Sequence, residues 1–164
     1  MKITLIAQHT AIIGLAATAL MDIWLIGLKR AGIPTMNFGL LGRWVGHLFK
    51  GRALHTQISK SPAVAGELIL GWLTHYLTGL LFAATLIMFA GEGWLISPTP
   101  LAAMATGITT VLCPWLLMQP AMGLGFAASK TPAPLGNALR NLINHTVFGF
   151  GLYIGGLLSN RLMG

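Results

Sequence analysis

The sequence predicts an all-α integral membrane protein, a bundle of four transmembrane helices with an amphipathic interfacial helix between the first and second spans. Three observations support this fold class. Of the 164 residues, 55% are hydrophobic and only 8% are charged, against roughly 25% charged residues in a soluble domain. Four apolar stretches are long enough to cross a bilayer, and none alternates as a barrel strand would. We expect residues 1–164 to form a single membrane domain.

A membrane-spanning helix needs about 20 apolar residues. The stretches that meet this length are residues 3–28, 68–90, 101–125 and 142–162. The first stretch resembles a secretory signal peptide, because Lys2 precedes it and Ala17-Thr18-Ala19 suits a cleavage site. Its apolar run continues to Leu28, which is too long for a typical signal core, so we expect a permanent span.

The basic residues predict how the chain is oriented. Eight of the ten Lys and Arg residues lie in the first and third connections, whereas the second connection carries only Glu92. The positive-inside rule therefore predicts that the first and third connections are cytoplasmic and that both termini are periplasmic. The net charge of +7 indicates contact with anionic lipid headgroups rather than with nucleic acid, which would require a basic soluble module.

The first connection contains a segment with helical periodicity, residues 38–50. Its apolar residues recur at helical spacing, and its basic residues fall between them on another face. We expect an amphipathic helix on the inner leaflet, with a helix packed beneath the bundle as the alternative. The residues expected at the lipid surface are Arg43, Trp44, His47 and Lys50.

Polar side chains inside the spans gather in their cytoplasmic halves. Each charged residue at the centre of a span costs about 2.5 to 3.5 kcal/mol on insertion scales, so each must face a partner or water. We therefore expect a polar cavity that binds a small molecule, an ion or a proton. Its candidate residues are Asp22, Glu67, His75, Gln119, Arg140, Asn144 and His145. The alternative is a structural network, with Asp22 paired to a cation such as Arg140.

Metal binding is a narrower version of this site. The candidate ligands are His75, His145 and Asp22, which are of types that zinc, iron or manganese accept. No HxxxH or HExxH spacing supports them. Met118, Met122 and Cys113 would suit copper(I), but methionines in an apolar chain more simply serve packing. The single cysteine excludes an internal disulfide.

Five segments of the chain carry a resemblance to a known family. They are Ala17-Thr18-Ala19-Leu20-Met21-Asp22-Ile23-Trp24, Gly42-Arg43-Trp44-Val45-Gly46-His47, Gly71-Trp72-Leu73-Thr74-His75-Tyr76, Pro114-Trp115-Leu116-Leu117-Met118-Gln119-Pro120-Ala121-Met122-Gly123 and His145-Thr146-Val147-Phe148-Gly149. With these segments the chain resembles the bacterial four-span membrane family designated domain of unknown function 2938. The resemblance covers nearly the whole chain and implies a bacterial inner-membrane location, but the family brings no established activity. It also implies that six residues belong to recurring motifs: Asp22, Arg43, His47, His75, Gln119 and His145.

Three functions follow from these features, in this order. The first is binding or transport of a small molecule, ion or proton; the second is a structural or accessory subunit that binds lipid and partner helices. The third is a metal-dependent membrane enzyme, although no motif of soluble-type catalysis is present. Glycine-rich faces on the third and fourth spans permit close helix contacts, and four helices enclose little volume, so we expect a homo-oligomer. No cofactor is indicated.

Overall fold

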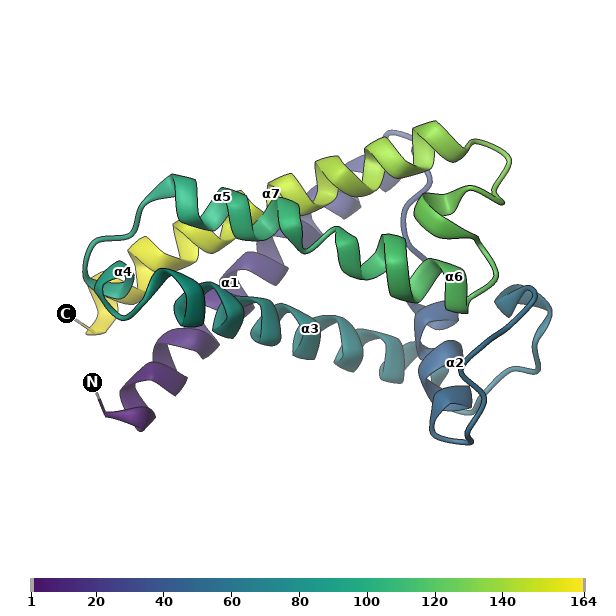
Figure 1. Cartoon of the computed structure of the whole chain (residues 1–164), viewed down its shortest axis with the longest axis horizontal. Helices are drawn as coiled ribbons and strands as arrows, with labels where there is room; N and C mark the ends of the chain where they lie inside the picture. Colours follow the sequence, from purple (N-terminus) through teal and green to yellow (C-terminus); the bar gives the residue numbers. More distant parts are fainter. Residues whose placement is uncertain (1, 164) are drawn as a thin grey trace. The chain divides into compact units, whose positions relative to one another are not determined.

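The computed structural model describes residues 2–163, and all the regular secondary structure within this range is helical. The longer helices are α1 (Ile3–Arg30), α2 (Phe38–Leu48), α3 (Glu67–Ala90), α5 (Pro100–Thr109) and α7 (Pro134–Met163), as Figure 1 shows. The short helical segments are η1 (Ile58–Lys60), α4 (Gly93–Ile96), η2 (Pro114–Met118), α6 (Gln119–Ala121) and η3 (Phe126–Ala128).

The four predicted spans are confirmed as helices that are long and apolar enough to cross a membrane: Ile3–Arg30, Glu67–Ala90, Pro100–Ala121 and Pro134–Met163. Two limits differ from the expected ones. The third span ends at Ala121 rather than at 125, because Gly123 and Gly125 adopt φ values of 86° and 75°, outside the right-handed helical region. The fourth begins at Pro134 rather than at 142. Its helix includes several polar residues before position 142, and these residues lower the hydropathy on which the expected limit was based.

By its internal contacts the chain divides into two compact units, and the single membrane domain expected from the sequence stays a prediction. Unit 1 comprises Met1–Pro34, Tyr76–Thr110 and Ile143–Gly164. Unit 2 comprises Thr35–His75 and Val111–Leu142. Hydropathy reflects only local composition, so it could not show this division.

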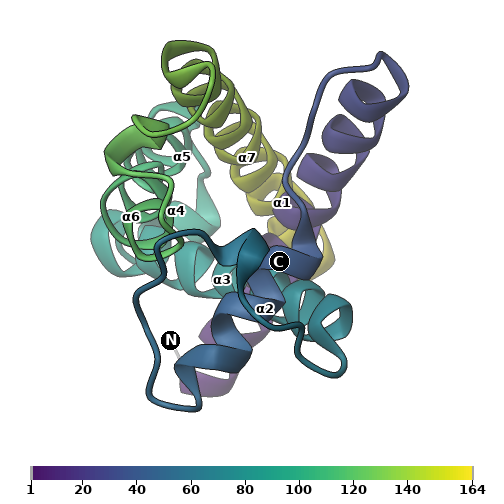
Figure 2. The ribbon, with the colours of Figure 1, turned by 90° about the vertical axis from the view of Figure 1, so that its right-hand side faces the viewer.

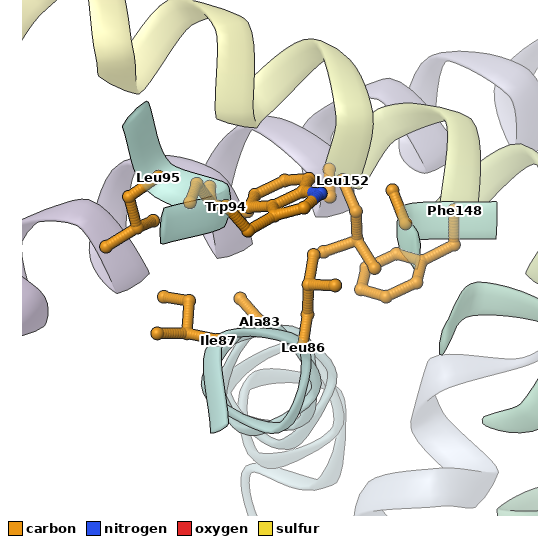
Figure 3. Close-up of a cluster of buried hydrophobic side chains, with 10 residues drawn as sticks. Ala83, Leu86, Ile87, Trp94, Leu95, Phe148 and Leu152 are labelled. Carbon is orange, nitrogen blue, oxygen red and sulfur yellow. The ribbon is translucent and has the colours of Figure 1, made fainter. Parts of the chain in front are cut away.

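The core of unit 1 is apolar. Figure 3 shows Leu86 of α3, Trp94 of α4 and Leu152 of α7 gathered around one centre, and all three are buried. Small residues bring the helices together: a Cβ atom on Gly107 of α5 would lie 2.3 Å from the Cα atom of Gly149 of α7. Such backbone contact is the usual basis of helix association in lipid, where dispersion and close fit replace the hydrophobic effect.

In unit 2, α2 packs against the first turns of α3 through two glycines. A Cβ atom on Gly42 would lie 1.7 Å from the carbonyl oxygen of Glu67, and one on Gly71 would lie 1.8 Å from that of Phe38. The Asn37 side chain caps α2 by accepting hydrogen bonds from two backbone N–H groups of its first turn. This close crossing favours the packed alternative for the amphipathic helix.

The third span widens where its prolines lie. Pro114 has no N–H to donate to the fourth residue before it, and the helix there takes the form of the π-helical segment η2. The N–H of Gln119 donates to the carbonyl of Pro114, five residues earlier. Trp115 and Gln119, one turn apart, therefore lie on the same side of this segment.

Candidate polar site in unit 2

The connection between α2 and α3 is anchored to the end of the third span. The N–H of His55 donates to the carbonyl of Ala121 at 2.8 Å, and that of Ile58 donates to the carbonyl of Met122 at 3.0 Å. Figures 1 and 2 show this connection passing beside α6. A Cβ atom on Gly123 would lie 2.1 Å from the carbonyl oxygen of Thr56, so only glycine permits the approach.

The anchored connection brings two histidines together. The Nε2 atom of His47 donates to the carbonyl of Pro62 at 2.9 Å. Because a carbonyl only accepts, the neutral His47 ring carries its lone pair on Nδ1. The Nδ1 atom of His55 lies 2.8 Å from the hydroxyl oxygen of Ser61. The two ring centres are 5.0 Å apart with 63° between the ring planes, and both side chains are buried.

The surroundings of His55 favour its neutral form. Burial lowers the pKa of the His55 imidazole, and the positive charge of Arg52 and the neighbouring His47 lower it further, against an opposing effect of the Arg52 backbone. At neutral pH the ring therefore offers a lone pair rather than a positive charge.

Three buried polar atoms of unit 2 have no hydrogen-bond partner among residues 2–163: His55 Nε2, Trp115 Nε1 and Gln119 Oε1. His55 is 6% exposed and Gln119 is 5% exposed. A buried polar group left unpaired costs about 1 to 3 kcal/mol, and folded proteins leave few of them. A partner for these atoms would therefore have to come from outside residues 2–163, as water, an ion or a small molecule.

An ion pair fixes the segments that carry this site. The Nε and Nη2 atoms of Arg43 donate to the two carboxylate oxygens of Glu67 at 2.8 and 2.7 Å. Nη1 donates to the carbonyls of Ser59 and Ser61 at 3.3 and 3.2 Å. The Val64 N–H also donates to Glu67, at 3.0 Å. One guanidinium thus binds the start of α3 and the segment beside the histidines, a bidentate arrangement that lysine cannot reproduce.

This arrangement corrects part of the expected lipid surface. Arg43 and His47 lie inside unit 2, with the Arg43 side chain 16% exposed, because the close packing of α2 turns its polar face toward the 59–67 segment. Trp44 donates to the carbonyl of Ala53 at 2.9 Å, and Lys50 is exposed. Lipid contact stays a prediction for these last two residues.

Three of the residues expected in the cavity belong to unit 1, where each has a partner. The Tyr76 hydroxyl donates to Asp22 at 2.8 Å. The Trp24 indole donates to the Asn144 side chain at 3.0 Å. His145 Nδ1 lies 2.8 Å from the Thr110 hydroxyl oxygen.

The other four belong to unit 2. Glu67 binds Arg43, and Gln119 holds the unpaired oxygen described above. His75 packs against the rings of Phe38 and Trp72, with centres 4.7 and 5.9 Å away. Arg140 donates to the Asn137 side chain at 3.3 Å. Within residues 2–163, no group of three or more His, Cys, Asp or Glu side chains is arranged to hold a metal ion.

Two contributors to the polar site, His55 and Trp115, were not among the candidate residues. His55 lies in a polar connection, where a histidine is ordinary, and tryptophan is common where spans meet the membrane surface. For Trp115, a usable signal was its position one turn before Gln119 on a proline-flanked segment.

The helices and this site define an all-α membrane protein with four candidate spans and a polar site in the unit that contains the long connection. The chain belongs to the family described as protein of unknown function (DUF2938), whose model matches residues 11–159. No curated protein and no solved structure matches the chain.

Proposed function

We propose that this protein binds a small polar molecule or ion in unit 2. It would either hold this ligand at the bacterial inner membrane or transport it across that membrane. The observation that supports the proposal is the set of unpaired buried atoms, His55 Nε2, Trp115 Nε1 and Gln119 Oε1. A protein that used these side chains only for packing would pair them with one another or replace them with apolar residues.

The sequence positions of these atoms suit exchange with the cytoplasm. Gln119 lies at the end of the third candidate span, and His55 lies in the basic connection that the positive-inside rule assigns to the cytoplasm. A ligand bound here would meet the membrane at the cytoplasmic boundary, with both chain termini on the periplasmic side. The cavity residues expected from sequence in unit 1 would then stabilise the helices, since each has a polar partner there.

A structural or accessory subunit is the second candidate. The glycine contacts of unit 1 and its hydrogen bonds between helices support it, because they describe a protein built for helix packing. Under this reading, ordered water alone completes the polar atoms of unit 2.

The two functions predict opposite effects of removing the Gln119 amide. We expect Gln119→Met to leave the thermal stability of the ligand-free protein in mild detergent unchanged or raised, because it removes an unsatisfied polar group without removing a bond. The matched control is Asn144→Leu, which removes the acceptor of the Trp24 indole and should destabilise by about 1 to 3 kcal/mol. A loss of stability in Gln119→Met equal to that of the control would contradict ligand binding and favour the structural role.

A further inference from the structure

We propose that His47 and His55 bind a divalent transition-metal ion of the zinc, copper or nickel class, with the side-chain oxygen of Gln119 as a third donor. The inference rests on the proposed function, because it names the chemical class of ligand for the same site. It replaces the metal ligands expected from sequence with a different pair of histidines.

The separation of the two rings fits shared coordination. An ion held tetrahedrally at about 2.1 Å from each nitrogen places two imidazole ring centres roughly 5 Å apart. The centres of His47 and His55 are 5.0 Å apart.

The hydrogen bonds of both rings also fit. Histidines that bind metals usually donate their other N–H to a carbonyl, a carboxylate or water, which fixes the tautomer and the ring orientation. His47 Nε2 donates to the Pro62 carbonyl, which leaves Nδ1 with a lone pair. When the Ser61 hydroxyl oxygen accepts a hydrogen bond from His55 Nδ1–H, the lone pair of the His55 ring lies on Nε2. This Nε2 atom is buried and has no hydrogen-bond partner among residues 2–163.

The donors select the class of ion. Two imidazole nitrogens and an amide oxygen suit zinc, copper(II) or nickel better than magnesium or calcium, which prefer sets of oxygen ligands. The positive charge of Arg52 near His55 opposes ions held by electrostatic attraction alone and favours those that form bonds with neutral nitrogen. Three protein donors leave a coordination position open, so we expect exchangeable binding that is weaker than at a four-ligand structural zinc site.

Arg43 would act as a positioning residue. It donates to the carbonyls of Ser59 and Ser61 and is itself held by Glu67. Ser61, which lies beside His55 Nδ1 and directly precedes Pro62, is therefore held through its carbonyl by the ion pair before any ion binds.

The test uses the full chain in mild detergent, treated with chelator, free of any polyhistidine tag and carrying Cys113→Ser to remove the exposed thiol. Binding of Zn²⁺ is measured by titration calorimetry, and binding of Co²⁺ by its visible absorption. We expect one equivalent per chain, at least tenfold weaker binding in His47→Asn or His55→Asn, and none in the double variant. The matched control is His75→Asn, which lies in unit 2 outside the pair and should bind as the parent does. Gln119→Met should also weaken binding, because it removes the third donor, and unchanged binding in this variant would overturn the assignment of that oxygen.

A second measurement covers variants that fail to fold. Zn²⁺ should raise the melting temperature of the parent protein in a concentration-dependent way, because it binds only the folded chain. Absence of Zn²⁺ and Co²⁺ binding in the parent, or binding that survives the double substitution, would overturn the metal site. If the parent binds no metal while Gln119→Met keeps its full stability, the metal inference fails and the proposed polar-ligand function stands.

Discussion

Arg43 bonds to acceptors on two segments of unit 2, the 59–61 segment and the first residue of α3. Its hydrogen bond to Glu67 raises the pKa of the guanidinium above its usual value, so the positive charge of Arg43 persists throughout the accessible pH range. The order of the connection thus depends on the planar fork of arginine more than on its charge.

We expect Arg43→Lys to loosen the connection although it conserves the charge, because an ammonium group cannot bind both carboxylate oxygens and both carbonyls in this geometry. The measurement is the rate of trypsin cleavage at Lys50, Arg52 and Lys60 in detergent, which should rise severalfold. Arg30→Lys, at the exposed end of α1, is the control and should leave these rates unchanged. Equal rates in the two variants would show that charge alone holds the connection.

At the residue scale, sequence predicted some contributors to the polar site and missed others. Gln119 was predictable because an amide inside an apolar span must meet a partner or a ligand. Glu67 was also selected, but its salt bridge to Arg43 was not foreseen, since the two residues lie 24 positions apart. Pairing at such a separation depends on the glycine contacts between α2 and α3, which hydropathy does not register.

At the element scale, the contact between α5 and α7 depends on Gly107. Its Cβ position lies 2.3 Å from backbone of α7, whereas the nearest atom to the Cβ position of Gly149 is 3.1 Å away. The two glycines are therefore unequal, and Gly107 is the more sensitive to substitution.

Gly107→Ala should separate the two helices and destabilise the protein by about 1 to 3 kcal/mol, the usual cost of overpacking. Thermal unfolding in detergent measures the loss. Gly136→Ala, in the first turns of α7, is the control: its Cβ would meet only Ala133, 3.9 Å away, and alanine has the higher helix propensity. An equally small effect in both variants would mean that α5 and α7 adjust freely.

The limits of the elements were less predictable than their number. All four spans were visible as apolar runs of sufficient length. The early start of α7 was not, because Asn137, Arg140 and Asn141 are helical yet too polar for a hydropathy window. Hydropathy also extended the third span past Ala121, since it does not register the backbone conformations that glycine permits.

At the scale of the whole molecule, large apolar side chains are exposed along every candidate span. Examples are Ile23, Leu81, Leu117 and Phe150, which are 71%, 66%, 67% and 50% exposed. A soluble protein rarely exposes apolar patches on this scale, whereas lipid tails would cover them. The fold class was therefore predictable from composition, because a chain surrounded by lipid needs long apolar segments that pair their backbone groups within helices. The division into two units was not.

The orientation of the chain is testable by cysteine labelling in a Cys113→Ser background. We expect Ser97→Cys, in the second connection, to react with a membrane-impermeant maleimide in intact cells, and Gln57→Cys, in the first, to react only after lysis. Both positions are exposed, so burial does not determine the outcome. The reverse pattern would place the basic connections outside and contradict the positive-inside assignment.

The π-helical segment η2 has a consequence for comparing related chains. A π-turn is equivalent to one residue inserted into an α-helix, and every later side chain is rotated by about 100° around the axis. A relative that lacks one residue between positions 114 and 118 and forms a regular α-helix there would keep the counterpart of Gln119 in the same direction, whereas a relative of equal length without the π-turn would point it elsewhere. A single-residue gap at this point of an alignment is therefore compatible with the polar site, whereas an ungapped relative with a regular helix through this segment would turn the counterpart of Gln119 away from it.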